Sequence, residues 1–107
     1  MTPDRWVEVP GAAGIRDGEV RDVNVEGIGV VVGRCEGRLH AVEDRCSHDD
    51  GPLGEGVLAG CEIVCPRHGA RFDLRDGKVT RMPAVAPIRS FSLKEEGGRV
   101  YLDAGGL

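Results

Sequence analysis

Short segments with strand-like patterns of hydrophobic and polar residues follow one another along the chain, with glycines between them. Residues 19–25, EVRDVNV, have the length and residue types of a strand, although their alternation is imperfect. Residues 29–34, GVVVGR, form a short apolar run bounded by glycine, which predicts a strand buried on both faces. After a turn at Glu36-Gly37, residues 38–42, RLHAV, alternate again.

The second half of the chain continues this pattern. Asp76-Gly77 has the sequence of a two-residue hairpin turn, and Gly97-Gly98 predicts a turn before the last strand. Residues 10–18, PGAAGIRDG, have room for a short helix, but their proline and glycines favour a loop. Further strands are expected at residues 63–64, 71–74, 78–80, 88–94 and 99–103.

Strands that recur about every 8–12 residues, with glycine turns between them, predict an antiparallel β-sandwich or small barrel. The 107 residues fit the size of one domain. No linker, internal repeat or low-complexity tract interrupts the pattern. We therefore expect an all-β fold that forms a single domain over residues 1–107.

The net charge of −4 argues against nucleic acid or an anionic membrane as a partner, because both select for surfaces rich in Lys and Arg. The chain lacks the ~18-residue apolar stretch that a membrane helix needs. Its first residues, MTPDRWVEVP, lack the apolar core of a secretory signal, so the cytoplasm is the expected compartment. In the cytoplasm, metal binding or catalysis is a more common use of the 4 cysteines than disulfides.

Two segments break the strand pattern, and each pairs a cysteine with a histidine. Cys46 and His48 lie in an acidic loop, EDRCSHDDGPLGE, while Cys65 and His68 lie in CPRHG, with residues 49–64 between the pairs. All four side chains are candidate metal ligands, because a tight loop can bring such a pair to one centre. Four ligands on one ion would make a tetrahedral zinc site. Two sulfurs on one iron and two nitrogens on another would make a Rieske [2Fe–2S] cluster.

The spacing favours the cluster over zinc. Zinc fingers usually pair cysteine with cysteine and histidine with histidine, whereas each loop here mixes the two. The segments CSHDDGPLGEG and CPRHGARFDLRDGKV resemble the Rieske ferredoxins, most closely the ferredoxin components of bacterial ring-hydroxylating dioxygenases. The resemblance extends over residues 7–103.

This resemblance implies a Rieske-like β-sandwich with a two-loop cluster-binding subdomain at about residues 44–74. Cys46 and Cys65 would bind the inner iron of the [2Fe–2S] cluster, and His48 and His68 the outer one. The protein would be a monomeric single-electron carrier and not an enzyme. It would accept electrons from a flavin-dependent reductase and pass them to a terminal non-haem iron oxygenase.

Other functions remain open at this stage. The same site would serve a redox-sensing module, an iron–sulfur-assembly module, or the small subunit of a nitrite-reductase-like complex. Such a small subunit can lack the cluster ligands, whereas all four are present here, which argues against a purely structural role. An oxygenase catalytic subunit would need a mononuclear iron site, usually two histidines and a carboxylate. His40 is the only histidine left to supply one.

Four positions differ from the respiratory Rieske proteins. Those proteins carry an extra cysteine in each loop, and the resulting disulfide braces the cluster; here Gly51 and Arg67 occupy the matching positions. They also donate hydroxyl groups to the cluster from the positions of Ala70 and Phe72. Because these donors stabilise the reduced cluster, we expect a potential toward the low end of the Rieske range of ~−150 to +300 mV.

The remaining cysteines and histidine have simpler interpretations. Cys35 and Cys61 lie at the edges of apolar strands, so we expect buried free thiols that behave as small hydrophobic residues. A metal pair of Cys61 and Cys65 would leave the Cys46 loop unexplained. His40 lies in an alternating strand without a partner at ligand spacing, and we expect it to face solvent or to be capped.

The acids of the first loop have two interpretations of equal weight. Asp49, Asp50 and Glu55 either form a docking surface for basic patches on redox partners or are ordinary solvated loop residues. Phe72 and Trp6 are expected in the core rather than as electron relays.

Overall fold

The structure, a computed structural model, describes residues 5–105. Within that range the chain is mostly extended, and its one helical turn is the 3-10 helix η1 (Ala12–Gly14), inside the segment expected to be a loop. No helix of the described residues is long and apolar enough to cross a membrane. The strands are β1 (Trp6–Glu8), β2 (Val20–Val25), β3 (Ile28–Cys35), β4 (Arg38–Glu43), β5 (Val57–Ala59), β6 (Glu62–Val64), β7 (Arg71–Asp73), β8 (Val79–Arg81), β9 (Ser90–Phe91), β10 (Leu93–Glu96) and β11 (Arg99–Asp103).

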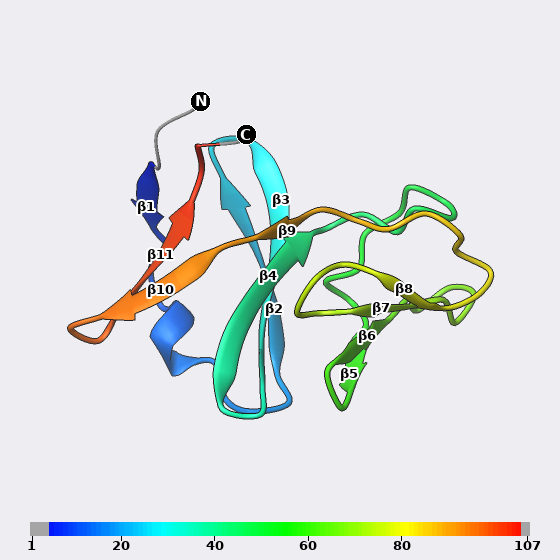
Figure 1. Ribbon diagram of the computed structural model, residues 1–107, viewed down its shortest axis with the longest axis horizontal. Coiled ribbons are helices and arrows are strands. Elements are labelled where there is room, and N and C mark those ends of the chain that lie inside the picture. Colours follow the sequence, from blue (N-terminus) through cyan, green and yellow to red (C-terminus); the bar gives the residue numbers. More distant parts are fainter. Residues whose placement is uncertain (1–4, 106–107) are drawn as a thin grey trace.

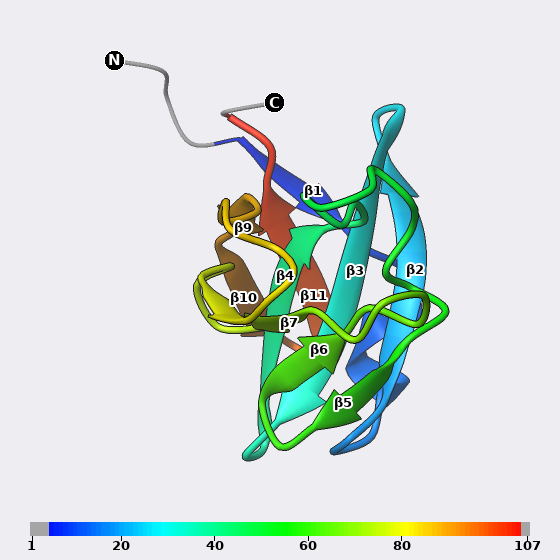
Figure 2. The same cartoon turned by 90° about the vertical axis from the view of Figure 1, so that its right-hand side faces the viewer.

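The strands form three antiparallel sheets that lie as layers (Figures 1 and 2). The central sheet has the order β2-β3-β4-β9. The β1-β11-β10 sheet covers one of its faces, and the β5-β6-β7-β8 sheet covers the other. We call the last one the cluster sheet, because both cysteine–histidine loops lie beside it. The predicted all-β antiparallel fold is confirmed.

Strand β3 contributes to the cores on both sides of the central sheet. Val30, Val31 and Val32 are completely buried. Val31 packs in the core that faces the cluster sheet, whereas Val30 and Val32 pack in the core on the other face, since side chains alternate along a strand. Each buried valine contributes roughly 1.5–3 kcal/mol of hydrophobic stabilisation. The predicted burial of this strand on both faces is confirmed.

The single strand predicted at residues 88–94 is wrong in one respect, because the structure divides it. β9 pairs with β4 of the central sheet, whereas β10 pairs with β11 of the outer sheet. The change of sheet occurs at Ser92, whose carbonyl accepts a hydrogen bond from the Asp103 amide at 3.0 Å. The alternating sequence predicts an extended chain correctly but contains no signal for which sheet each half joins.

The two-residue hairpin predicted at Asp76-Gly77 is also wrong in its length. β7 and β8 are antiparallel neighbours, but residues 74–78 connect them. The Asp73 amide donates to the Lys78 carbonyl at 2.8 Å, and the Gly77 amide donates to the Asp73 carbonyl at 2.7 Å. Gly77 has a φ of 78° and lies against the Ile88 carbonyl, where a Cβ atom would come within 2.1 Å. The glycine therefore allows close packing as well as the turn.

Candidate metal centre

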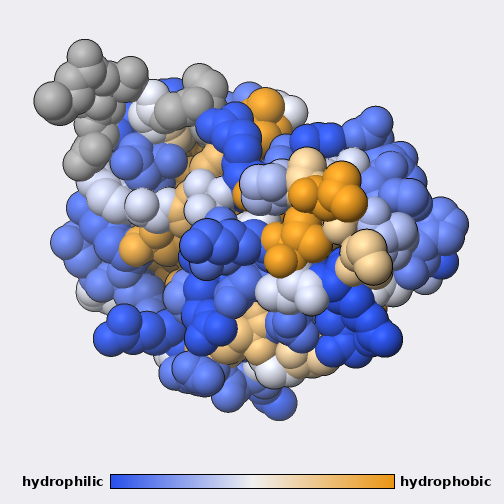
Figure 3. All heavy atoms as spheres, turned by 45° about the vertical axis from the view of Figure 1, so that its right-hand side comes forward, coloured by the Kyte–Doolittle hydropathy of each residue, from blue (hydrophilic) through white to orange (hydrophobic). Residues whose placement is uncertain are grey.

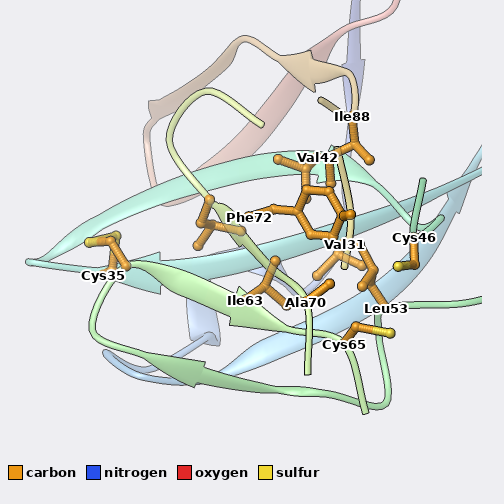
Figure 4. Close-up of a cluster of buried hydrophobic side chains, with 13 residues drawn as sticks. Val31, Cys35, Val42, Cys46, Leu53, Ile63, Cys65, Ala70, Phe72 and Ile88 are labelled. Atoms are coloured by element: carbon orange, nitrogen blue, oxygen red, sulfur yellow. A yellow bond between two sulfur atoms is a disulfide. The ribbon is translucent and has the colours of Figure 1, made fainter. Parts of the chain in front are cut away.

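The two cysteine–histidine loops lie side by side at one end of the core. The first follows β4 and the second follows β6. Figure 4 shows Cys46 and Cys65 near each other at one end of the buried cluster of side chains. Their sulfur atoms lie within 4.8 Å of each other, and both side chains are buried. The sequence prediction that these loops converge is confirmed.

The two predicted histidines are not among the ligand atoms that lie within 4.8 Å of both thiols. Both His48 and His68 are exposed. Their rings meet edge to face, with centroids 5.2 Å apart and planes at 86°. The four candidate ligands are thus separated by type, with the sulfur atoms buried and the nitrogen atoms at the surface.

The backbones of the two loops have the same hydrogen-bond pattern. The Cys46 amide donates to the Gly51 carbonyl at 2.8 Å, five residues on, and the Cys65 amide donates to the Ala70 carbonyl at 2.7 Å, also five residues on. In the reverse direction, the amides of Asp50 and Gly69 donate to the carbonyls of Cys46 and Cys65. Each loop is therefore the same closed turn, which fixes the direction of its cysteine.

The fourth residue after each cysteine has a left-handed backbone conformation. It is Asp50 in the first loop, with a φ of 62°, and Gly69 in the second, with a φ of 76°. Glycine adopts this conformation without steric cost, and aspartate is one of the few other residues that tolerate it. The two loops therefore have the same backbone conformation at this position, although one has aspartate there and the other has glycine.

Asp44 closes the first loop at its base. Its carboxylate oxygen Oδ1 accepts hydrogen bonds from the amides of Leu53 at 2.6 Å and Gly54 at 2.8 Å. Leu53 is completely buried in the core beneath the thiols. Residues 44 and 53 are therefore tied together at the two ends of the loop. The sequence analysis missed this role, because an aspartate in an acidic segment has no distinguishing pattern.

Arg67 joins the second loop to the first. Its guanidinium group donates to both carboxylate oxygens of Asp49, with Nε–Oδ2 at 2.5 Å and Nη2–Oδ1 at 3.0 Å. It also donates to the Pro52 carbonyl at 2.8 Å. A Cβ atom on Gly51 would lie 2.6 Å from the guanidinium carbon, so the glycine makes room for this contact. Arg67 of the second loop is thus held by hydrogen bonds to the first loop and by the space beside Gly51.

This contact changes the interpretation of the acidic residues. The hydrogen bonds from Arg67 and then the Gly51 amide hold the pKa of Asp49 well below its usual range. The Asp49 carboxylate is only 20% exposed, so it connects the loops rather than being freely available to a docking partner. Asp50, at 78% exposure, makes an exposed ion pair with Arg45. Glu55 is also exposed.

The core beneath the thiols is apolar. Phe72 and Ala70 are completely buried and belong to the same core as Cys46 and Cys65. Burial is the main cause of a raised pKa for the Cys46 thiol. A bound metal would offset this effect, because metal coordination favours the thiolate. The expectation that Phe72 is a core residue is confirmed. Trp6, by contrast, is only half-buried. The ammonium nitrogen of Lys94 lies 4.5 Å from the centroid of the Trp6 ring.

The separation of sulfur from nitrogen ligands fits a cluster in which one iron takes two thiolates and the other takes two imidazoles. Asp49 is the third side chain with an atom within 4.8 Å of both thiols, but its carboxylate is already bound by Arg67. The donor set therefore suits a Rieske cluster.

The chain also matches a known protein family over most of its length. Residues 5–92 match the Rieske [2Fe-2S] domain. The chain is a Rieske [2Fe–2S] protein. The sequence-based assignment to this family and the expected cofactor are both confirmed.

Two curated relatives of this Rieske protein are ferredoxin components. The naphthalene 1,2-dioxygenase system ferredoxin component of Pseudomonas putida is 34% identical over 99 residues, which cover 92% of this chain and 95% of the relative. The biphenyl 2,3-dioxygenase ferredoxin component of Rhodococcus jostii (strain RHA1) is 39% identical over 77 residues, or 72% of each chain.

Solved structures show the same likeness. The ferredoxin of carbazole 1,9a-dioxygenase from Nocardioides aromaticivorans IC177 superimposes with a TM-score of 0.86 at 31% identity, covering 92% of this chain and 96% of that one. A chain in a complex of reduced oxygenase and oxidized ferredoxin in carbazole 1,9a-dioxygenase has a TM-score of 0.85 at 33% identity, with 92% of each chain covered.

The expectation that Cys35 and Cys61 are free thiols is wrong. They form a disulfide, with Cα atoms 5.4 Å apart. Both cysteines are buried, as predicted, but their positions in the sequence do not indicate that they meet. They come together because the cluster sheet packs on the central sheet, and this packing brings the end of β3 next to the start of β6. Neither Cys46 nor Cys65 takes part in a disulfide, so both sulfur atoms can serve as iron ligands.

His40 is half-buried on β4, away from both loops of the Rieske protein. Burial is the main cause of its lowered pKa, and the charges of Arg75 and Arg38 add to it. Its side chain is half-buried rather than fully solvent-facing, and its absence from the ligand set stays a prediction. It lines a groove of about 570 Å³ together with Arg38 and Arg75.

Proposed function

We propose that this Rieske protein is a single-electron carrier, in which Cys46 and Cys65 bind the inner iron of the cluster and His48 and His68 the outer one. The observation that carries the proposal is that two exposed imidazoles meet edge to face on the same two loops that hold two buried thiols. When bound, a Rieske cluster takes up and releases one electron. The buried cysteines anchor it in the apolar core, and the histidines provide the edge that a partner protein can approach.

We further propose a flavin-dependent reductase as the electron donor and a terminal non-haem iron oxygenase as the acceptor. The names of the relatives support the oxygenase as acceptor, because they are ferredoxin components of dioxygenase systems. The reductase as donor follows from the resemblance to Rieske ferredoxins alone. One similar chain comes from a complex of an oxygenase with a ferredoxin. On this proposal the chain is a component of an oxygenase system and not its catalytic subunit. It acts in the cytoplasm as one domain over residues 1–107, with the cluster-binding loops at about 44–74.

The surface beside the first loop suits a protein partner. Ser47 donates its hydroxyl hydrogen to the Ala86 carbonyl, which places the segment after β8 against this loop. In that segment Val85 is 86% exposed and Met82 is 76% exposed. Figure 3 shows apolar side chains gathered on this side of an otherwise mainly hydrophilic molecule. Exposed apolar surface of this kind is typical of interaction sites.

The purified protein tests the ligand assignment. We expect two irons and two acid-labile sulfides per chain, with a Rieske-type electron spin resonance signal after reduction by dithionite. His48→Ala and His68→Ala should abolish that signal, whereas His40→Ala, the matched control, should retain it. One zinc and no sulfide would overturn the assignment.

Transfer kinetics test the carrier function separately. Reduced protein mixed with an oxidised ring-hydroxylating oxygenase should lose its electron in a single concentration-dependent step. Val85→Asp, which adds a charge to the exposed apolar surface, should slow this step and leave the cluster spectrum unchanged. A protein with an intact cluster that reduces no oxygenase of this class would exclude the carrier function while preserving the ligand assignment.

A further inference from the structure

The Cys35–Cys61 disulfide lies in the same apolar core as the cluster thiols but at its other end. Figure 4 shows Cys35 on one side of Phe72, and Cys46 and Cys65 on the opposite side. All four cysteines belong to this single core. The Rieske protein therefore has two pairs of sulfur atoms, one at each end of the layer between the central sheet and the cluster sheet.

The disulfide fastens these two sheets together. Cys35 is the last residue of β3 in the central sheet, and Cys61 directly precedes β6 in the cluster sheet. No ladder of strand pairs connects the two sheets among the described residues, so side-chain packing, chain connections and loop hydrogen bonds such as that from the Ile88 amide to the Gly77 carbonyl hold them. The disulfide adds a covalent connection at the end remote from the metal ligands. Opening it would allow the two layers to move apart more easily.

The disulfide is largely buried, but one of its cysteines, Cys35, lines a surface cleft. Cys61 retains 8% of its surface and Cys35 retains 3%. A cleft of about 300 Å³ opens beside the bond, and it contains two acidic residues. The residues that line it are Asp17, Gly18, Cys35, Glu36, Leu58 and Gly60.

We propose that Cys35 and Cys61 are a redox-active pair, opened by a dithiol reductant of the thioredoxin class, and that its state controls how firmly the cluster is held. A thiolate of the dithiol attacks one sulfur, and the S–S bond breaks as a mixed disulfide forms. The second thiol of the reductant then displaces the other cysteine. The products are two protein thiols and one oxidised dithiol, so two electrons and two protons pass to the protein. The electron carried by the cluster takes no part.

The test uses the holoprotein purified without reductant. Alkylation followed by peptide mass spectrometry reports the state of Cys35 and Cys61, and visible absorbance in the presence of an iron chelator reports cluster loss. We expect both cysteines to be protected at first and alkylated after treatment with thioredoxin, thioredoxin reductase and NADPH. Cluster loss should then be about threefold faster or more, since local opening exposes the site. Reoxidation should restore the original rate.

A double variant separates this effect from direct attack on the cluster. Cys35→Ala/Cys61→Ala should lose its cluster at the rate of the reduced wild-type protein, and reductant should not change that rate. Equal acceleration by reductant in the variant would overturn the proposal. Three results with the wild-type protein would also overturn it. Cys35 and Cys61 could be fully alkylated before reduction, the reductant could fail to open the disulfide in the folded protein, or the rate of cluster loss could be unchanged after the disulfide is opened. If the variant does not fold, the wild-type measurements still decide.

The acids of the cleft predict which small thiols react fastest. Asp17 and Glu36 line the approach to the bond, so a cationic thiol should open it faster than an anionic one. Cysteamine and mercaptoethanesulfonate are suitable probes. We divide the rate with cysteamine by the rate with mercaptoethanesulfonate, each corrected for the pKa of the thiol. This ratio should be larger for the protein than for a small-molecule disulfide, and it should decrease with added salt. A ratio equal to the small-molecule value would show that reaction does not occur through this cleft.

Discussion

Arg67 binds the carboxylate of Asp49 with two hydrogen bonds, and this pair joins the two loops that carry the candidate cluster ligands. In the respiratory Rieske proteins, a bracing disulfide joins the positions that match Gly51 and Arg67. Here the same two positions are in direct contact without a covalent bond, because the guanidinium group occupies the space next to Gly51. No disulfide joins the loops at these positions, but the ion pair between Arg67 and Asp49 connects them instead.

Arg67→Ala should therefore accelerate cluster loss. The substitution removes both hydrogen bonds to Asp49 and the bond to the Pro52 carbonyl, so the loops lose three hydrogen bonds that join them. We expect loss to be several-fold faster at neutral pH, followed by visible absorbance with a chelator. Arg45→Ala is the control: it removes ion pairs to exposed Asp50 and to Glu43, neither of which joins the two loops. Equal effects of the two substitutions would argue against a specific role for Arg67.

Gly69→Ala should destabilise the second loop through its backbone. Gly69 has a φ of 76° with open space around it, so only the left-handed conformation opposes a side chain there. We expect a loss of about 1–2 kcal/mol, measured by denaturant unfolding. Gly60, with a φ of 66° and equally open surroundings, provides the control. Both substitutions should cost similar stability, but only the change at Gly69 should alter the spin resonance signal of the cluster.

Ala70→Ser should raise the reduction potential. Ala70 is buried beneath the thiols and has no hydroxyl group to donate toward a cluster. A new donor that favours the reduced form by about 1.4 kcal/mol would raise a one-electron potential by ~59 mV. Protein-film voltammetry measures the change, with Ala104→Ser in the other core as the control. The wild-type potential should lie toward the low end of the ~−150 to +300 mV range; a value near the top would refute the interpretation of these positions.

His40 should make stability depend on pH. Its pKa is lowered in the folded protein, so the unfolded chain takes up the proton first as the pH falls. The stability contributed by neutral His40 is complete above the unfolded pKa of about 6.5 and is lost as the pH falls through the lower folded value. Denaturant midpoints at pH 8 and pH 5.5 should therefore differ less for His40→Gln than for the wild-type protein. An equal difference would exclude this residue as a source of the pH dependence.

The strands and the four candidate ligands could be predicted because they depend on local sequence. The run at residues 29–34 indicates a strand buried on both faces, and Val30, Val31 and Val32 are buried as expected. Cysteine and histidine at one- and two-residue spacings limit the chemistry to few metal sites. These signals are contained in a few consecutive residues, so they do not require knowledge of the packing.

The parts that could not be predicted depend on residues that are distant in the sequence. Cys35 meets Cys61 only after two sheets have packed together. The chain leaves the central sheet at Ser92, although residues on both sides of it have the same alternating pattern. Strands β1 and β5, of three residues each, are not among the strands expected from the sequence. Asp49 has the sequence context of a solvated acid. It connects the two loops only because the fold brings Arg67 next to it.

The identical closure of the two ligand loops has a consequence for protein engineering. Each loop is a six-residue unit with its own internal hydrogen bonds, running from Cys46 to Gly51 and from Cys65 to Ala70. A unit that holds its own shape can be transplanted. Two antiparallel hairpins whose ends face each other across an apolar layer would offer a designer the same attachment points, with Arg67 and Asp49 included to set the distance between the grafts.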